Sequence, residues 1–219
     1  MHRFDSVFAK CALFEGITPD ELHTMLSCIA GRLVEVEKGQ TIVQEGDPAN
    51  TVGLVLRGAV QLVREDYYGN RSIVAHIAPS ELFGESYACA DISAMPVSIV
   101  ATQESTVLLM DCRRLTTSCC NACSFHSRII YNLLGLVAKK NLVYDQKIRI
   151  LSQRSTREKL MAYLLSQAKL HGSNCFSIPY DRQALADYLE VERSGLSAEI
   201  SKLRREGVLE SEKNQFRLR

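Results

Sequence analysis

The chain has 219 residues, of which 46% are hydrophobic and 23% charged, so it can bury the core of one large or two modest domains and is not expected to be disordered. Its net charge is +1, but residues 1–144 carry a net charge of −3 and residues 145–219 a net charge of +4, so the C-terminal part suits a polyanion better. No apolar run approaches the roughly 20 residues of a membrane span, and the first 16 residues lack the apolar segment of a signal peptide, which predicts a cytoplasmic protein without membrane association.

Residues 4–29 are predicted to be helical. Thr18 can cap a helix that begins at Pro19, and Glu21 lies three residues after the cap, as in a capping box. The apolar face of this helix would consist of Leu22, Met25, Leu26 and Ile29.

From Leu33 the apolar period changes to two, and short runs rich in Val, Ile and Leu continue to about residue 111. Glycines separate these runs at intervals of about 7 to 15 residues, which predicts an antiparallel sandwich or barrel. Residues 45–47 and 68–70 are the best hairpin turns because Gly, Asn and Asp accept positive φ.

Four segments of this part resemble the cyclic-nucleotide-binding β-roll of the bacterial Crp/Fnr regulators: KGQTIVQEGDPANTVGLVLRGAVQLV, YGNRSIVAHI, LFGES and MPVSIVA. The resemblance implies an α+β protein with an N-terminal antiparallel, jelly-roll-like β-roll that holds an effector. In the family, the segment matched by Gly84, Glu85 and Ser86 holds the ligand's phosphate and ribose.

The same resemblance calls for an arginine ten residues after the glutamate, since a buried phosphate needs a cationic, bidentate partner. Met95 stands there, and the adjacent Pro96 has no backbone N–H to donate. Burying a phosphate opposite a thioether would cost several kcal/mol. We therefore expect no binding of cyclic AMP or cyclic GMP, and Glu85 is then expected to be a turn residue that caps nearby N–H groups.

A cysteine cluster follows a short helix expected over residues 111–118. Cys120 and Cys123 have CxxC spacing, Cys119 precedes them, and His126 lies three residues after Cys123. In a chain without an export signal such cysteines are structural thiols, redox groups or ligands of a metal or haem, and the sequence leaves these three open. No cofactor is identified from the sequence.

A long helix is predicted over residues 125–152. Its apolar residues alternate steps of four and three, which is an a/d seam with a mean period of 3.5. The seam consists of Ile130, Leu134, Val137, Asn141, Tyr144, Ile148 and Leu151. Such a helix either is buried within one domain or pairs with its copy in a second subunit, with Asn141 fixing the register. The resemblance also places Tyr144 and Asp145 in the segment that closes over the effector pocket.

The C-terminal part has the pattern of a winged helix-turn-helix. Ser155 and Glu158 form a second capping box, and CFSIP is expected to be a strand. Two helices, from Asp181 as cap to Leu189 and over residues 193–206, are joined by a three-residue turn and followed by a hairpin. The whole segment resembles the Crp/Fnr DNA-binding domain.

That resemblance makes residues 193–206 the recognition helix. Arg193 matches the position whose guanidinium reads guanine O6 and N7. Ser194 replaces the usual glutamate, Ala198 stands where a second arginine is common, and Ser197 could add a hydroxyl contact, so the sequence preference should differ from that of cyclic-AMP-responsive members. Phosphate contacts are expected from Arg182, Gln183 and Lys213.

Together these features predict a sensor β-roll over residues 1–122, a dimerisation helix over 123–152 and a DNA-binding domain over 153–219. The expected function is that of a homodimeric transcription regulator reading an inverted repeat under an effector or redox signal. Double-stranded DNA is the expected partner and RNA polymerase a candidate one. The alternative is a small-molecule-binding regulatory protein without a DNA role. An enzyme is not expected, because His76 stands alone among the strands and no catalytic cluster is present.

Overall fold

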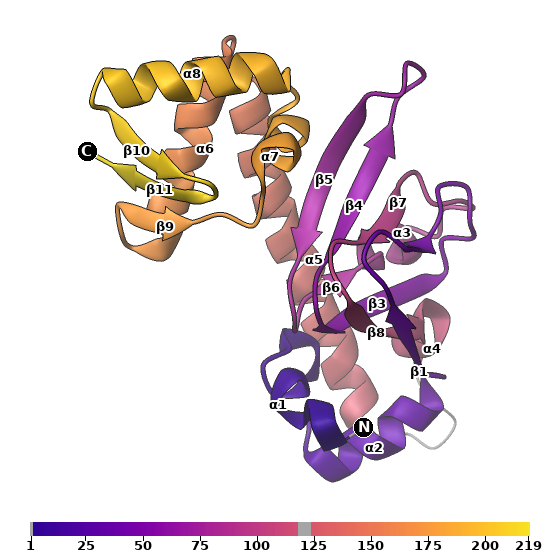
Figure 1. The fold of residues 1–219 in the computed structure, drawn as a ribbon. Helices are drawn as coiled ribbons and strands as arrows, with labels where there is room; N and C mark the ends of the chain where they lie inside the picture. The colour runs from indigo at the N-terminus through magenta and orange to yellow at the C-terminus, as the bar shows by residue number, and fades with distance from the viewer. Residues whose placement is uncertain (1, 118–123) are drawn as a thin grey trace. The chain divides into compact units, whose positions relative to one another are not determined.

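The computed structural model describes residues 2–117 and 124–219 and contains two compact units (Figure 1). The first unit comprises Met1–Asp66 and Val74–Asn141, and the second comprises Tyr67–Ile73 and Leu142–Arg219. The prediction about Cys119, Cys120 and Cys123 lies outside the described residues.

Short helices open the first unit. Their bounds are η1 His2–Phe4, α1 Asp5–Phe8, η2 Ala12–Phe14 and α2 Pro19–Cys28. The predicted capping box of α2 is confirmed: the Thr18 amide donates to Glu21 Oε2 at 2.9 Å, and the Glu21 amide donates to Thr18 Oγ1 at 3.3 Å. The helices were predicted as one region, but turns at residues 9–11 and 15–18 divide them.

Two four-stranded antiparallel sheets form the β-roll, as the alternating pattern predicted. Their orders are β1-β8-β3-β6 and β2-β7-β4-β5. The strands are β1 Arg32–Val36, β2 Thr41–Val43, β3 Thr51–Arg57, β4 Val60–Glu65, β5 Arg71–Ile77, β6 Leu82–Phe83, β7 Ser98–Ala101 and β8 Ser105–Asp111. Between the sheets lies a buried apolar cluster that includes Val55, Leu62, Phe83, Met95 and Ile99.

Of the two predicted hairpins, one is correct. Residues 68–70 form the turn that connects β4 to its sheet neighbour β5, and Gly69 in this turn has φ +79°. Residues 45–47 also turn, with Gly46 at φ +93°, but the prediction of a hairpin there is wrong. The strand before this turn pairs with β7 and the strand after it pairs with β8, so the turn connects two different sheets.

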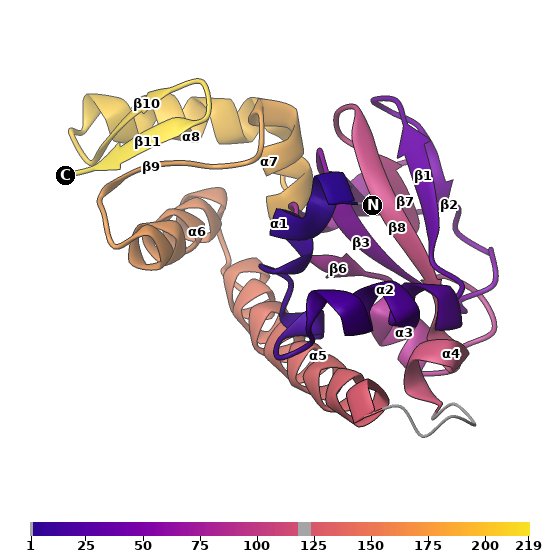
Figure 2. The same ribbon diagram turned by 90° about the horizontal axis from the view of Figure 1, so that it is seen from below.

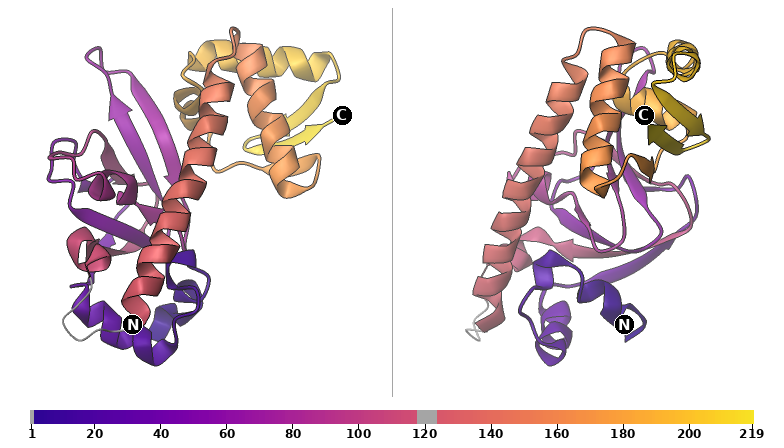
Figure 3. Two further views of the ribbon diagram at one scale, coloured as in Figure 1. Left: turned by 180° about the vertical axis from the view of Figure 1, so that it is seen from behind. Right: turned by 90° about the vertical axis from the view of Figure 1, so that its left-hand side faces the viewer.

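Helix α5 (Ser124–Leu151) runs without a break for 28 residues, as Figure 3 shows. Two short helices precede it, α3 (Glu85–Cys89) and α4 (Cys112–Thr116). The first half of α5 packs on the N-terminal helices through buried Phe125, Ile129 and Leu133. Asn132 adds two hydrogen bonds, from Nδ2 to the Leu13 and Glu15 carbonyls at 2.9 and 3.0 Å.

The predicted a/d seam of α5 divides into two rows. Leu134, Asn141 and Ile148, each seven residues apart, are exposed. The alternate row is half-buried and consists of Ile130, Val137, Tyr144 and Leu151. Val137 packs against the core of its own chain, so part of the predicted seam is covered within the chain, and pairing of the seam with a second copy stays a prediction. The helix carries an inward face and a separate outward apolar face.

The second unit contains α6 (Thr156–His171), α7 (Arg182–Leu189), α8 (Arg193–Arg205) and a three-stranded sheet of order β10-β11-β9. The strands are β9 Cys175–Ser177, β10 Leu209–Glu212 and β11 Gln215–Leu218. The second capping box is confirmed, since the Glu158 amide donates to Ser155 Oγ at 3.2 Å and the Ser155 amide to Glu158 Oε2 at 3.0 Å. Figure 2 shows the β10–β11 hairpin beside α8, the arrangement of a winged helix-turn-helix.

Lys147 of α5 contacts two other segments of this unit. Its ammonium lies 4.4 Å from the centroid of the Tyr188 ring and donates to the Ile73 carbonyl. Tyr188 in turn packs with Tyr163 and Tyr180 at ring-centroid distances of 5.2 and 4.9 Å. The charge over the ring gives a cation–π contact that links the end of α5 to α7.

Candidate functional site

Helix α8 has an apolar face that packs on the rest of the unit and an opposite, exposed face that is mainly polar. Leu196, Ile200 and Leu203 are buried against the rest of the unit, and their steps of four and three residues place them on one face of the helix. The first turn therefore faces outward, with Arg193 and Ser194 exposed. The N-cap residue Glu192 makes no side-chain cap hydrogen bond, so the N-terminus of α8 has open amide groups where an anion is favoured.

The other residues expected on the reading surface also come from α8. Ala198 is exposed and Ser197 is half-buried. Ser201, one turn further on, donates its hydroxyl to the Ser197 carbonyl at 2.9 Å. The structure thus places Arg193, Ser194 and Ala198 on one accessible surface, and their contacts with bases stay a prediction.

Arg182, the first residue of α7, lies in a strongly positive environment. Burial lowers the pKa of its guanidinium, and the positive charges of Arg193 and Arg204 lower it further. Its Nη1 is buried and finds no hydrogen-bond partner among the residues that the structure describes. Because an unsatisfied buried cation is costly, a phosphate oxygen is the partner that this group fits. The sequence gives no sign that Arg204, 22 residues after Arg182, acts on the same guanidinium.

The other two predicted phosphate contacts differ in availability. Gln183 is exposed, but its Nε2 donates to Asp187 Oδ1 at 2.8 Å within α7. Lys213 is exposed in the turn between β10 and β11, with φ +51°. Because the Gln183 amide already donates within α7 whereas Lys213 is exposed, Lys213 is the more available of the two.

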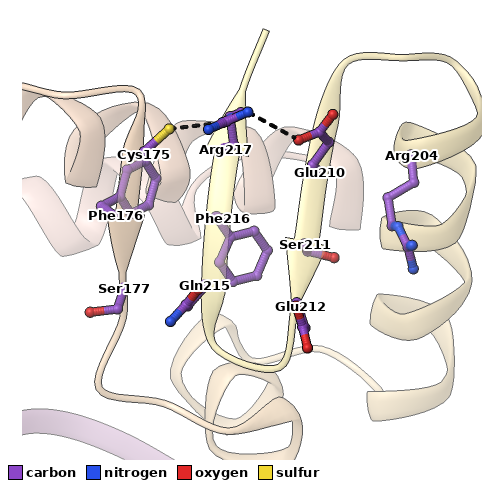
Figure 4. A pocket seen from close by; sticks show the side chains of 10 residues that line it. All are labelled: Cys175, Phe176, Ser177, Arg204, Glu210, Ser211, Glu212, Gln215, Phe216 and Arg217. Carbon is purple, nitrogen blue, oxygen red and sulfur yellow. Dashed lines mark hydrogen bonds and ion pairs between the residues drawn. The ribbon is translucent and has the colours of Figure 1, made fainter.

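A broad concavity of about 930 Å³ lies on the wing sheet (Figure 4). Arg217 is central to it, donating from Nε to Cys175 Sγ at 2.9 Å and lying 3.7 Å from Glu210. The hydrogen bond to the sulfur and the adjacent carboxylate raise the pKa of Arg217. With Glu212 also in the lining, the cavity presents both signs of charge and does not single out an anionic ligand.

The predicted effector pocket is organised around Glu85. Gly84, at φ +79°, turns the chain into α3, and a Cβ there would lie 2.8 Å from the Thr51 carbonyl oxygen, so the position requires glycine. The Glu85 side chain is only 1% exposed and forms an ion pair at 2.6 Å with Lys140 of α5. Ser86 Oγ lies 3.5 Å from the same carboxylate oxygen, at the outer limit of a hydrogen bond.

Lys140 is the residue of this pocket that sequence reasoning missed. Its ammonium also donates to the Leu82 carbonyl at 2.6 Å, so α5 is tied both to the strand before Gly84 and to Glu85 after it. The carboxylate therefore has a cation from the chain itself, and the expectation that Glu85 caps local N–H groups is wrong. Glu85 Oε2 is buried without a hydrogen-bond partner among the described residues.

The remaining pocket residues are placed as follows. Met95 is buried among the apolar side chains between the two sheets, and Pro96 is exposed. Asp145 pairs with Arg149 at 2.9 Å along α5, and Tyr144 is half-buried. Tyr144 and Asp145 belong to the second unit, so their role at the pocket stays a prediction.

His126 is the described member of the predicted cysteine cluster. It is buried, its ring centroid lies 4.7 Å from that of Phe125, and its Nδ1 has no hydrogen-bond partner among the described residues. Across residues 2–117 and 124–219, no group of three or more His, Cys, Asp or Glu side chains is placed to hold a metal ion. In the same residues no helix is long and apolar enough to cross a membrane.

Comparison with known proteins gives matches in both units. Residues 33–117 match the family model of the cyclic nucleotide-binding domain, and residues 158–219 match that of the Crp-like helix-turn-helix domain. The chain is 28% identical over 204 residues to the cyclic AMP receptor protein of Thermus thermophilus, covering 90% of this chain and 87% of that protein. It is 27% identical over 217 residues to the transcriptional activator protein FnrL of Cereibacter sphaeroides, covering 94% and 81%.

Solved structures share the fold. The regulator CLP of Xanthomonas campestris superimposes with a TM-score of 0.74 at 17% identity, covering 90% of this chain and 97% of that one. FixK2 of Bradyrhizobium japonicum superimposes with a TM-score of 0.69 at 22% identity, covering 86% and 92%. At these identities the similarity shows that the fold is shared. It does not show which ligand binds to this chain.

Proposed function

The chain belongs to the Crp/Fnr family of DNA-binding transcription regulators, which are not enzymes, and from this premise we propose that it reads an inverted-repeat operator as a homodimer. The observation that carries the proposal is the exposed N-terminal turn of α8, with Arg193 at its first position. A helix of this kind enters the major groove with its first residues toward the base edges. As a transcription regulator it would act in the cytoplasm, with RNA polymerase as a candidate partner.

The outward face of α5 supports the homodimer. At about 100° per residue, Tyr131, Leu134, Leu142 and Ile148 lie on one side of the helix. The exposed fractions of Leu134 and Leu142 are 67% and 71%. A second copy of the same helix would bury these side chains, with Asn141 between them as the polar residue that fixes the register. Two-fold symmetry of the protein then requires two-fold symmetry of the operator.

Control is proposed to come from an effector or redox signal at the β-roll and α5, and not from cyclic AMP. Met95 fills the apolar interior instead of supplying a guanidinium, and Glu85 is already paired with Lys140. A cyclic nucleotide would have to compete with that ammonium for Glu85, and Met95 offers its phosphate no counter-charge. Titration of cyclic AMP to millimolar concentration should give no saturable heat, and a saturable signal would overturn this part of the proposal.

The DNA-reading role is tested by Arg193→Ala. A bidentate arginine–guanine contact discriminates by about 1–3 kcal/mol, so each half-site should lose roughly 5- to 150-fold in specific affinity while non-specific binding remains. Arg205→Ala is the matched control, because it removes the same charge at the other end of α8, about 18 Å away along the axis. Equal losses in the two variants at matched salt would contradict the assignment of Arg193.

A further inference from the structure

Two cysteines far apart in the sequence meet in the first unit. Cys89, the last residue of α3, lies with its sulfur 3.8 Å from the sulfur of Cys112, the first residue of α4. Both are reduced in the structure. A disulfide requires a sulfur–sulfur distance of about 2.05 Å, so the two atoms need to approach by less than 2 Å.

The two thiols differ in a way that suits stepwise oxidation. Cys89 is exposed, whereas Cys112 is 4% exposed. The hydrogen bond between the two thiols lowers the pKa of Cys89, and the same hydrogen bond together with burial raises the pKa of Cys112. Cys89 is therefore the thiol with thiolate character and access to solvent, and Cys112 is the protonated thiol behind it.

Cys89 reaches solvent directly because it is exposed, and a small cavity borders its buried partner Cys112. The cavity has a volume of about 230 Å³ and is lined by Cys112 together with Asn50, Ala88, Asp91 and Arg113. A molecule the size of hydrogen peroxide fits such a space. Arg113 and Asp91, which lie 4.0 Å apart, add charged groups to its lining.

We propose that Cys89 and Cys112 form a peroxide-sensitive dithiol that closes to an intrachain disulfide. The Cys89 thiolate attacks one oxygen of hydrogen peroxide, the O–O bond breaks, and the released hydroxide takes a proton from solvent to leave as water. Cys89 is then a sulfenic acid. The Cys112 sulfur attacks the Cys89 sulfur, the S–O bond breaks, and the Cys112 proton leaves with the hydroxyl as a second water. The net change is one peroxide reduced to two waters and two thiols oxidised to one disulfide.

The position of the pair gives the disulfide a route to the rest of the molecule. Helix α3 has only five residues, with Cys89 at one end and Glu85 at the other. Pulling Cys89 toward α4 moves this single turn, and Glu85 carries the movement to Lys140 of α5. The regulatory step rests on the DNA-binding function proposed above, whereas the thiol chemistry does not.

The chemistry is tested on the folded full-length protein. Reduced protein is treated with a small molar excess of hydrogen peroxide, free thiols are alkylated, and the digest is analysed by mass spectrometry. The expected product is a peptide pair joined through Cys89 and Cys112, absent from Cys112→Ser, in which Cys89 should accumulate as sulfenic acid. The same measurement is made on the triple variant Cys119→Ser/Cys120→Ser/Cys123→Ser, in which these three cysteines can no longer react with the sulfenic acid of Cys89. Absence of the joined peptides from both wild type and the triple variant would overturn the proposal.

The regulatory step is tested by operator affinity before and after oxidation. We expect at least a fivefold change in wild type, reversed by dithiothreitol, and no change in Cys89→Ser. Cys175→Ser is the control for an exposed thiol elsewhere and should respond like wild type. A joined peptide pair with unchanged affinity would refute the regulatory step. Loss of all sequence-specific binding in the reduced and oxidised states alike would instead contradict the proposed DNA-reading function, whatever the peptide map shows.

Discussion

The ion pair between Glu85 and Lys140 links the β-roll to α5, and Lys140→Met tests what this pair contributes to stability. Lys140 Nζ lies 2.6 Å from the Glu85 carboxylate and 2.6 Å from the Leu82 carbonyl. Methionine keeps the length of the side chain but leaves a carboxylate that is 1% exposed without its cation. Removing one partner of a buried pair costs about 3–5 kcal/mol. The 21% exposure of the lysine side chain places the expected loss near the lower end, at about 3 kcal/mol.

For a protein of this size each kcal/mol shifts the melting temperature by roughly 2–4 °C, so Lys140→Met should lower Tm by about 6–12 °C in a circular-dichroism melt. Lys139→Met, an exposed neighbour on the same helix, is the control and should stay within about 0.5 kcal/mol of wild type. The double variant Glu85→Gln/Lys140→Met should recover part of the loss, because the buried group is then uncharged. A Tm change below about 2 °C for Lys140→Met, with no effect of the second substitution, would show that the pair does not stabilise the fold.

Further substitutions probe the β-roll turn, the outward face of α5 and the wing. Gly84→Ala places a Cβ 2.8 Å from a backbone oxygen at positive φ and should destabilise by at least about 1–2 kcal/mol in chemical denaturation, whereas Gly135→Ala, with open space around it, should not destabilise. Leu134→Glu should convert the dimer to monomer in light scattering, while Leu170→Glu, an equally exposed leucine on α6, should leave the mass unchanged. Lys213→Ala should reduce the slope of log K against log salt by about 0.9 for each phosphate that the lysine neutralises, with sequence preference retained, and an unchanged slope would place Lys213 off the DNA.

Features that depend on residues close together in the sequence were predictable from the sequence. The capping boxes at Thr18 and Ser155 join residues only three positions apart, and both have the predicted hydrogen bonds. The inward residues of α8 follow from its 3.6-residue period. The turn at residues 45–47 shows the limit of local reasoning, because turn chemistry fixes a change of direction but not which sheet receives the next strand.

Contacts between distant residues were not predictable in this way. Glu85 and Lys140 are 55 residues apart. The sequence around Glu85 does not indicate which cationic side chain will pair with its carboxylate. Cys89 and Cys112 likewise meet only because α3 and α4 fold together. On α5 the heptad pattern was interpreted as one seam, since two apolar rows at a spacing of seven look alike until packing separates the inward row from the outward one.

The proposed function requires that the protein reads a two-fold symmetric DNA sequence through α8. Full-length reduced protein can be used to select bound DNA from a random pool, which tests this requirement. We expect the wild-type protein to select an inverted repeat whose half-sites lie about one helical turn apart and that contains a guanine at a fixed position in each half-site. The Arg193→Ala variant should no longer prefer guanine at that position. Enrichment of a single, asymmetric half-site, or the same motif from Arg193→Ala, would contradict the claim.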